Sequence, residues 1–254
     1  MLMTREALTL VSPMPLRAEP APELAAEIEE QAIRLDQADP EAILGWASER
    51  FGSGLTMATA FGVEGCLILH FLSRVAPKTR VFNLDTGYQF AETLDVRNRI
   101  REKYGIDVEL VQPSTTVAEY ETEHGGPLHR HRPDQCCYDR KVVPLRRAVA
   151  GYTAWISGIR AEETDQRSRG RIIQWDAKFG VTKINPLLNW NRKRVWSAVI
   201  SWNVPYNSLH DRGYESIGCE PCTVPGAGRE GRWGGMAKKE CGLHVQEHEQ
   251  GSGI

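Results

Sequence analysis

The chain has 254 residues and carries 31 lysines and arginines against 33 aspartates and glutamates, a formal net charge of −2. This length suffices for one large α/β domain or two small ones. The near-neutral balance provides no general attraction to nucleic acid or to an anionic membrane, so we expect neither partner. No stretch approaches the roughly 18 consecutive apolar residues of a membrane helix, and the first residues lack the apolar core of a secretory signal. The sequence therefore predicts a cytoplasmic protein.

Residues 1–21 are rich in proline and show no periodicity, so we expect a disordered lead-in. Apolar residues then recur at helical spacing over residues 22–36. Pro40 opens a second helical stretch that reaches Phe51. The sequence predicts two helices before any strand.

Strands and helices alternate from residue 55 onward. The predicted strands are 55–60, 80–84, 107–113, 152–160 and 182–188. The predicted helices are 66–75, a helix after residue 87 that turns Phe90, Leu94 and Ile100 inward, and 191–202. This alternation predicts an α/β fold with a mostly parallel sheet flanked by helices.

Three turns follow predicted strands: "AFGVEG" (60–65), "LDTG" (84–87) and "SGIR" (157–160). Ligands of mostly parallel sheets bind beyond the carboxyl ends of the strands. We therefore expect these turns to border one ligand crevice.

The amino-acid composition changes at about Asn207, after which glycine, proline and charged residues dominate. A segment of this length without regular helices or strands is uncommon in a compact domain unless it has a function. Its cysteines are the candidates for holding it in place.

Four cysteines form two close pairs, Cys136 with Cys137 and Cys219 with Cys222. Four thiolates complete a tetrahedral zinc site or a cubane iron–sulfur cluster. Adjacent side chains diverge and do not easily reach one small ion, which favours the cluster. A thioredoxin-like redox pair or unrelated core cysteines are the alternatives. The "CEPC" pair lies in a Gly/Pro-rich loop rather than at the start of a helix, which disfavours the redox pair.

Cys241 lies apart, in "KKECGLH". A thiol becomes a nucleophile when nearby cations favour its thiolate, and Lys238, Lys239 and His244 are close in sequence. Cys241 is therefore a candidate nucleophile, with an incidental exposed cysteine as the alternative. Cys66 lies in an apolar helix and is predicted to be a core residue.

Arginines gather after "SGIR" and in "GREGRW". Guanidinium groups bind phosphate or sulfate oxygens in a bidentate manner, although such runs can also be a solvated face. Because these segments border the predicted crevice, the sequence favours a multiply anionic ligand. The residues are Arg160, Arg167, Arg169, Arg171, Arg229 and Arg232.

The motifs "CCYDRK", "SIGCEPCT", "REGRW", "KECGLH", "LDTG" and "VPYNSLHDRGY" together resemble those of the assimilatory adenosine 5′-phosphosulfate reductases, within the phosphoadenylyl-sulfate reductase family, from about Gly52 to Val245. The resemblance implies an adenine nucleotide α-hydrolase-like (Rossmann-like) fold. It also implies reduction of adenosine 5′-phosphosulfate to sulfite and AMP, with thioredoxin as the reductant. Both cysteine pairs imply a 4Fe-4S cluster and a substrate without a 3′-phosphate.

The resemblance also assigns residues. Cys136, Cys137, Cys219 and Cys222 would hold the cluster, and Cys241 would be the nucleophile. Lys141 would lie between cluster and sulfate, whereas Arg229, Arg232 and Arg167 would bind the phosphosulfate. The nucleotide loops would contribute Thr59, Phe61, Gly62, Asp85 and Gly87.

The first of these loops departs from the serine-rich loop of many relatives. It also lacks the SGGxDS pattern of ATP-hydrolysing members of the wider superfamily, which disfavours an ATP pyrophosphatase.

On this reading, residues 22–206 form the nucleotide-binding domain, and residues 207–254 add a cluster-binding loop and a catalytic tail to it. The glycines of residues 228–244 predict a lid that closes over the substrate. A homo-oligomer is compatible with the sequence. Three alternatives stay open: a 3′-phosphorylated substrate or both nucleotides, an iron–sulfur enzyme that transfers sulfur to tRNA or DNA, and a zinc-binding interaction module.

Overall fold

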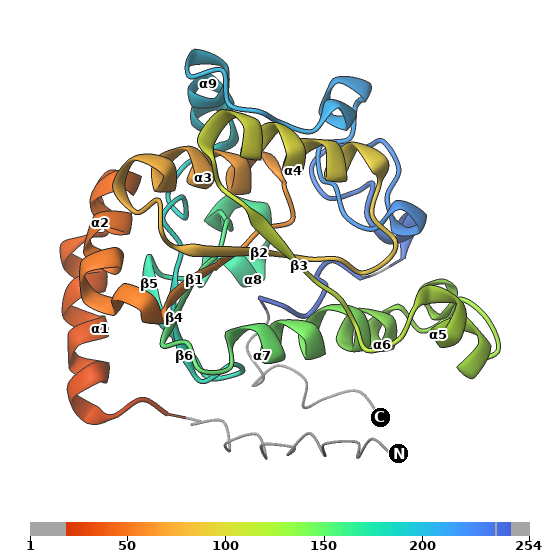
Figure 1. Ribbon diagram of the computed structural model, residues 1–254, viewed down its shortest axis with the longest axis horizontal. Helices are drawn as coiled ribbons and strands as arrows, with labels where there is room; N and C mark the ends of the chain where they lie inside the picture. Colours follow the sequence, from red (N-terminus) through yellow and green to blue (C-terminus); the bar gives the residue numbers. More distant parts are fainter. Residues whose placement is uncertain (1–18, 237, 245–254) are drawn as a thin grey trace, which may run out of the picture.

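The computed structural model describes residues 19–236 and 238–244. A twisted sheet crosses the centre of the molecule (Figure 1), with strand order β3-β2-β1-β4-β6-β5. β5 pairs with β6 in antiparallel fashion, and the other neighbouring pairs are parallel. The strands are β1 (Leu55–Ala58), β2 (Arg80–Leu84), β3 (Val108–Val111), β4 (Ala154–Ile156), β5 (Ile173–Asp176) and β6 (Val181–Ile184). The predicted α/β fold with a mostly parallel sheet is confirmed.

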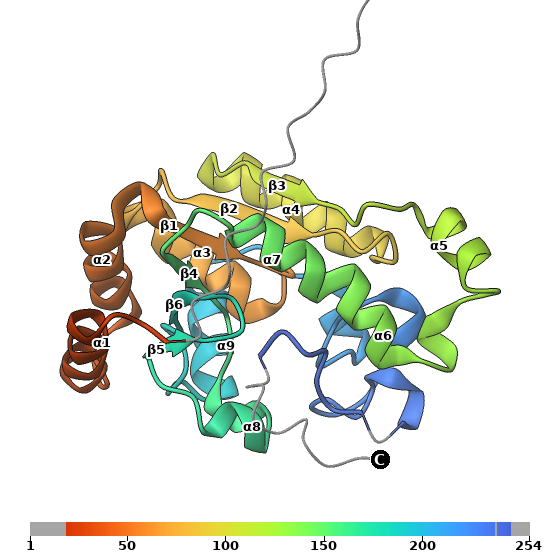
Figure 2. The same cartoon turned by 90° about the horizontal axis from the view of Figure 1, so that it is seen from below.

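Helices cover the two faces of the sheet unequally. One face carries α2 (Pro40–Phe51), α3 (Val63–Val75), α4 (Ala91–Tyr104) and α9 (Arg192–Ser201), and α1 (Pro22–Arg34) packs along β5. Figure 2 shows the opposite face, where α7 (Val143–Val149) crosses the sheet. The smaller core on that side includes Phe82, Leu145 and Trp155, and Leu243 from the end of the described chain packs against it. Leu243 therefore completes the second layer.

The connection between β3 and β4 is helical, which the sequence analysis did not predict. α5 (Val117–Glu123) begins with a capping box between Thr116 and Glu119. α6 (Pro133–Cys137) continues through a π-helical turn, Tyr138–Val142, into α7. Pro144 has no N–H to donate, and its ring crowds the carbonyl one turn earlier, so the helix widens just before it. Lys141 lies in this widened turn, and Cys136 and Cys137 end the helix directly before it.

Several predicted details were wrong. The first strand ends at Ala58 rather than at residue 60, and α3 begins at Val63 rather than at Cys66. Leu94 was predicted to face inward but is 39% exposed. The antiparallel edge strand β5 was not predicted. Cys66 is fully buried in the core, as expected.

The late segment is held by short turns rather than by long elements. They are 3₁₀ turns at Ser208–Arg212, Glu220–Cys222 and Trp233–Gly235. Thr164, directly before the short helix α8 (Asp165–Ser168), and Arg167 within it both donate hydrogen bonds to Glu240. An isolated bridge pairs Gln89 with Cys219, which ties this segment to the region after β2. Residues 1–18 of the predicted lead-in, Ala237 of the predicted lid and residues 245–254 lie outside the described residues. In the part of the chain that is described, every helix falls short of what a membrane crossing requires.

Candidate active site

A cavity of about 320 Å³ opens at the carboxyl edge of the sheet. β1 and β4 are neighbours there, and the chain leaves them toward opposite sides, which is the switch point where open α/β sheets bind ligands. The loops after β1 and β4 supply one wall, including Thr59, Gly62 and Gly158. Residues between His210 and His244 supply the other wall.

Backbone geometry shapes the loop after β1. The Thr59 hydroxyl accepts a hydrogen bond from the Phe61 N–H at 3.1 Å, and Asn83 donates to the Thr59 carbonyl at 2.8 Å. A Cβ on Gly158 would lie 3.2 Å from the Gly65 nitrogen, so the two loops approach through bare backbone. Phe61 has φ +54° and is 1% exposed within the core. Its side chain is therefore a core residue and is not among the described residues that line the cavity, contrary to its expected place.

The "LDTG" turn reaches the cavity through its first residue, because Leu84 is among the residues that line it. Asp85 accepts hydrogen bonds from the Gly87 N–H at 3.0 Å and from Gln112 at 2.9 Å, and neither Asp85 nor Gly87 is among the described lining residues. The Thr86 hydroxyl oxygen lies 3.3 Å from the Cys219 sulfur. The Thr86 carbonyl accepts a hydrogen bond from Arg140 Nε at 2.7 Å. Thr86 therefore connects this turn to the cysteine region, whereas Leu84 lines the larger cavity.

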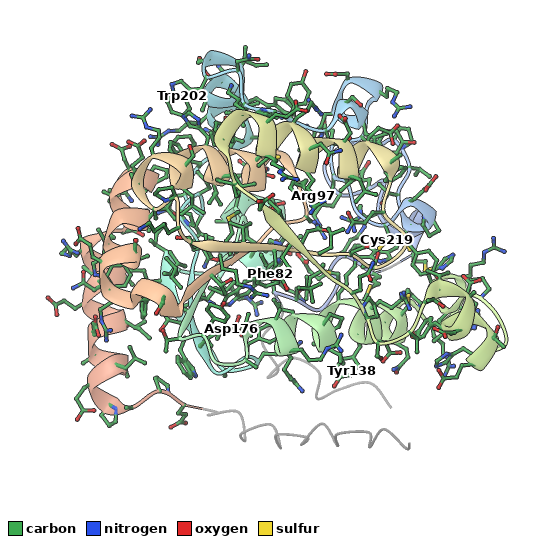
Figure 3. The ribbon with its side chains drawn as sticks, in the orientation of Figure 1. Phe82, Arg97, Tyr138, Asp176, Trp202 and Cys219 are labelled. Carbon is green, nitrogen blue, oxygen red and sulfur yellow. The ribbon has the colours of Figure 1, made fainter. Side chains whose placement is uncertain are left out.

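The two cysteine pairs meet in a second, smaller cavity. Cys136, Cys137, Cys219 and Cys222 all line it, together with Lys141, and all four are free thiols. Figure 3 labels Cys219 near α6, at the end of the sheet away from Asp176. Burial raises the pKa of Cys136 to about 12 and that of Cys222 to about 11.

No group of three or more His, Cys, Asp or Glu side chains within residues 19–236 and 238–244 could hold a metal ion as placed. The four thiols nevertheless match an iron–sulfur cluster in number and in chemistry. Because these residues come from two distant segments, a group bound by all four would join those segments.

Lys141 lines both cavities, and Cys241 lines the larger one. Burial of Cys241 opposes its ionisation, but the Lys141 charge and the Leu243 N–H together lower the pKa of the thiol below its ordinary value. Cys241 thus lines the cavity beside a cation that favours its thiolate.

The three tail residues that the sequence analysis named near Cys241 have other partners. Lys238 pairs with Asp134, and the Lys239 carbonyl accepts hydrogen bonds from Arg229 at 2.9 and 3.2 Å. Burial and neighbouring cations hold the pKa of His244 well below its ordinary value, so that ring is neutral at pH 7. The cations that lower the pKa of the thiol are Lys141, which is 100 residues before Cys241 in the sequence, and Arg232, which is nine residues before it.

The three predicted ligand-binding arginines line the larger cavity, but two of them contact Glu240, the residue directly before Cys241. Arg167 donates to both oxygens of Glu240 at 2.8 and 3.1 Å and to Glu163 at 2.6 Å. Arg229 lies 3.5 Å from Glu240. Arg232 donates to the Ser216 hydroxyl at 3.2 Å, and its buried Nε has no hydrogen-bond partner among the described residues.

Of the other arginines in this run, Arg160 also lines the larger cavity, whereas Arg171 is not among the described lining residues. Arg160 is paired with Glu64 at 2.8 Å beside the cavity, and Arg171 is paired with Glu29 at the surface.

Sequence reasoning missed two residues of the site. Glu240, directly before Cys241, is buried between the arginines. Lys183 on β6 is 2% exposed and donates to His244 Nδ1 at 3.1 Å. A lysine inside the apolar strand "VTKI" was a usable signal, because charged residues are rarely buried without a partner.

In comparisons with known proteins, the chain matches members of a single family. Residues 54–225 match the phosphoadenosine phosphosulfate reductase domain. The chain is 43% identical over 225 residues to a protein of Gloeobacter violaceus named phosphoadenosine 5′-phosphosulfate reductase, which covers 86% of this chain and 93% of that protein. It is 42% identical over 216 residues to the adenosine 5′-phosphosulfate reductase of Salinibacter ruber, covering 83% of this chain and 86% of the relative.

Solved structures agree on the fold. The phosphoadenylyl-sulfate reductase of Candida auris, in a phosphate complex, superposes with a TM-score of 0.70 at 30% identity and covers 81% of this chain and 98% of its own. The FMN adenylyltransferase of Candida glabrata has a TM-score of 0.55 at 18% identity, covers 79% of this chain and 65% of its own, and shares the fold alone. The fold, the matched residues and these relatives together show that the chain belongs to the phosphoadenosine phosphosulfate reductase family.

Proposed function

We propose that this protein reduces adenosine 5′-phosphosulfate to sulfite and AMP in sulfate assimilation, with Cys241 as the nucleophile and thioredoxin as the reductant. One observation carries the proposal. The Cys241 thiol lines the same cavity as the strand-end loops, Lys141 and the arginines of the late segment. A nucleophile, cationic groups and a nucleotide-sized cavity at the switch point thus share one site.

The first step is an exchange at sulfur. The Cys241 thiolate attacks the sulfate sulfur, the S–O bond to the phosphate breaks, and AMP leaves with the electron pair. The product is a cysteine S-sulfonate. Both reactants are anionic, so like-charge repulsion opposes the approach, and Lys141 and Arg232 offset it by their position beside the thiol.

The second step releases the product. A thioredoxin thiolate attacks the Cys241 sulfur, sulfite leaves, and a mixed disulfide forms. The second thioredoxin thiol then restores Cys241 and leaves oxidised thioredoxin, so the dithiol supplies the two electrons that reduce the sulfur.

We further infer that Cys136, Cys137, Cys219 and Cys222 hold a 4Fe-4S cluster. The inference is supported by four free thiols in one cavity and by Lys141, which lines that cavity as well as the larger one. When bound, the cluster would supply a rigid, negatively charged link between the helix that carries Cys136 and the loop that carries Cys219. The protein itself would then hold Lys141 between cluster and substrate.

Anaerobic purification followed by iron and sulfide analysis tests the cofactor. Sulfite release from adenosine 5′-phosphosulfate and from its 3′-phosphorylated form, with thioredoxin, tests the reaction. The second nucleotide belongs in the assay because the Gloeobacter violaceus relative is named for it. Cys241→Ser should abolish sulfite release, whereas Cys66→Ala, which alters a core thiol, should retain it. Activity in Cys241→Ser, or protein that contains zinc but no iron, would contradict the proposal.

A further inference from the structure

Lys183 occupies an unusual position for a charged side chain. It lies on the inner strand β6, between β4 and β5, and is 2% exposed. Burial lowers the pKa of its amine to about 8, despite the opposing charge of Asp176. Burying an amine costs stability unless a defined partner compensates for it. The position therefore requires an explanation in terms of its contacts.

Its contacts lead to the chain terminus. The Lys183 amine donates to His244 Nδ1 at 3.1 Å and lies 5.1 Å from the centre of the Trp155 ring. The His244 ring lies parallel to the same indole, with the ring centres 5.9 Å apart and the planes inclined by 4°. The Trp155 Nε1–H donates to Asp176 at 3.2 Å, which fixes the indole. Lys183 and Trp155 thus hold the His244 side chain between a hydrogen-bond donor and an aromatic ring.

The two residues before His244 are also attached to this part of the sheet. Lys178, in the turn between β5 and β6, donates to the Gly242 carbonyl at 2.8 Å. Leu243 packs against the smaller core that contains Leu145 and Trp155. Residues 242–244 are therefore bound to the β5–β6 hairpin and to β4, and Leu243 and His244 line the cavity together with Cys241.

We propose that Lys183 is a positioning residue for the reaction: by holding His244 on Trp155, it fixes the chain three residues after Cys241 and so sets the thiol toward the sulfate. The inference rests on the proposed function of Cys241. Release of His244 leaves Cys241 attached on its other side, through Glu240, so the thiol stays in the cavity but loses its fixed orientation. A displacement of about 1 Å at a reacting atom can lower a rate by a factor of about 100.

The test is Lys183→Met, which fills the same space without an amine. The rate of S-sulfonate formation on Cys241, followed by mass spectrometry in a single turnover without thioredoxin, should fall about 30- to 100-fold. The KM for the nucleotide should change less than about threefold, because Lys183 is not among the described residues that line the cavity. Lys183→Arg should restore part of the rate. Lys193→Met, at an exposed lysine on α9, is the matched control and should behave as wild type.

Two further measurements separate positioning from a general loss of structure. His244→Phe keeps a ring on Trp155 but removes the acceptor, so it should lower the rate as Lys183→Met does, and the double variant should be no slower than either single one. Hydrogen exchange should increase in residues 240–244 of Lys183→Met and stay unchanged in β1 and β4.

An unchanged rate in Lys183→Met, additive effects in the double variant, or faster exchange throughout the sheet would overturn the proposal. If wild-type protein forms no S-sulfonate from either nucleotide, the proposed function fails instead, and the exchange measurement decides whether Lys183 holds the tail.

Discussion

Replacing Glu240 by glutamine should weaken the docking of residues 240–244 while leaving the fold intact. The Glu240 side chain is 6% exposed, accepts two hydrogen bonds from Arg167 at 2.8 and 3.1 Å, and accepts one from the Thr164 hydroxyl at 2.9 Å. The attached arginines hold the pKa of this carboxyl below its ordinary value despite burial, so the group is charged at pH 7. Glutamine keeps the size and one acceptor oxygen but removes the charge.

The magnitude follows from the contacts that remain. A hydrogen bond to a charged group contributes about 1.5–3 kcal/mol. Arg167 keeps its second carboxylate, Glu163, at 2.6 Å, so the variant does not leave an unpaired buried cation. We therefore expect a loss of about 2 kcal/mol in tail docking rather than the 3–5 kcal/mol of a buried pair broken outright. This corresponds to an opening equilibrium that is about 30-fold more favourable, at about 1.4 kcal/mol per tenfold change.

Native-state hydrogen exchange of the amides of residues 240–244 measures that equilibrium directly. Glu230→Gln is the control, because Glu230 is an exposed carboxylate of the same late segment. Exchange should accelerate about 30-fold in the first variant and stay unchanged in the second. An acceleration below about threefold, or an equal one in the control, would refute the argument that Glu240 holds the tail through Arg167.

Three other predictions address separate parts of the structure. Cys241→Ser should retain iron and bind AMP as wild type does, by calorimetry, because the substitution changes one atom; loss of nucleotide binding would show that the thiol also shapes the cavity. Gly158→Ala should weaken AMP binding about tenfold with little change in Tm, because its Cβ would lie 3.2 Å from the Gly65 nitrogen and force the two loops apart; unchanged affinity would contradict this close approach. The pKa of Lys183 is about 8 in the folded protein and 10.5 ordinarily, so the unfolded state binds more protons between these values. The free energy of unfolding of the wild type relative to Lys183→Met should then rise by about 3 kcal/mol from pH 8 to pH 10.5, by denaturant titration, and a constant difference would disprove a buried amine.

Local patterns determined much of what could be predicted. Apolar strands followed by turns and periodic helices indicated the mostly parallel sheet, because burial on both faces leaves a signal in each segment by itself. The paired cysteines and Cys241 were recognisable because their chemistry is carried by residue type and spacing. The expected turns after β1 and β4 lie at the cavity for the same reason, since the carboxyl ends of parallel strands meet at one edge.

Tertiary structure alone decided which charges meet. Thr164 and Glu240 are 76 residues apart in sequence, and Lys183 and His244 are 61 apart, so no local pattern reports either contact. Strand β5 has four residues and pairs with β6 as an antiparallel edge strand. Four positions are too few to show the alternation of apolar and polar residues that indicates a strand. Phe61 was predicted beside the nucleotide, but its positive φ turns the side chain into the core. The sequence by itself thus determined most of the parallel strands and the cysteines that are candidates for chemistry. Packing determined which cations lie near Cys241 and which residues hold residues 240–244, because electrostatic partners depend on distance in space and not along the chain.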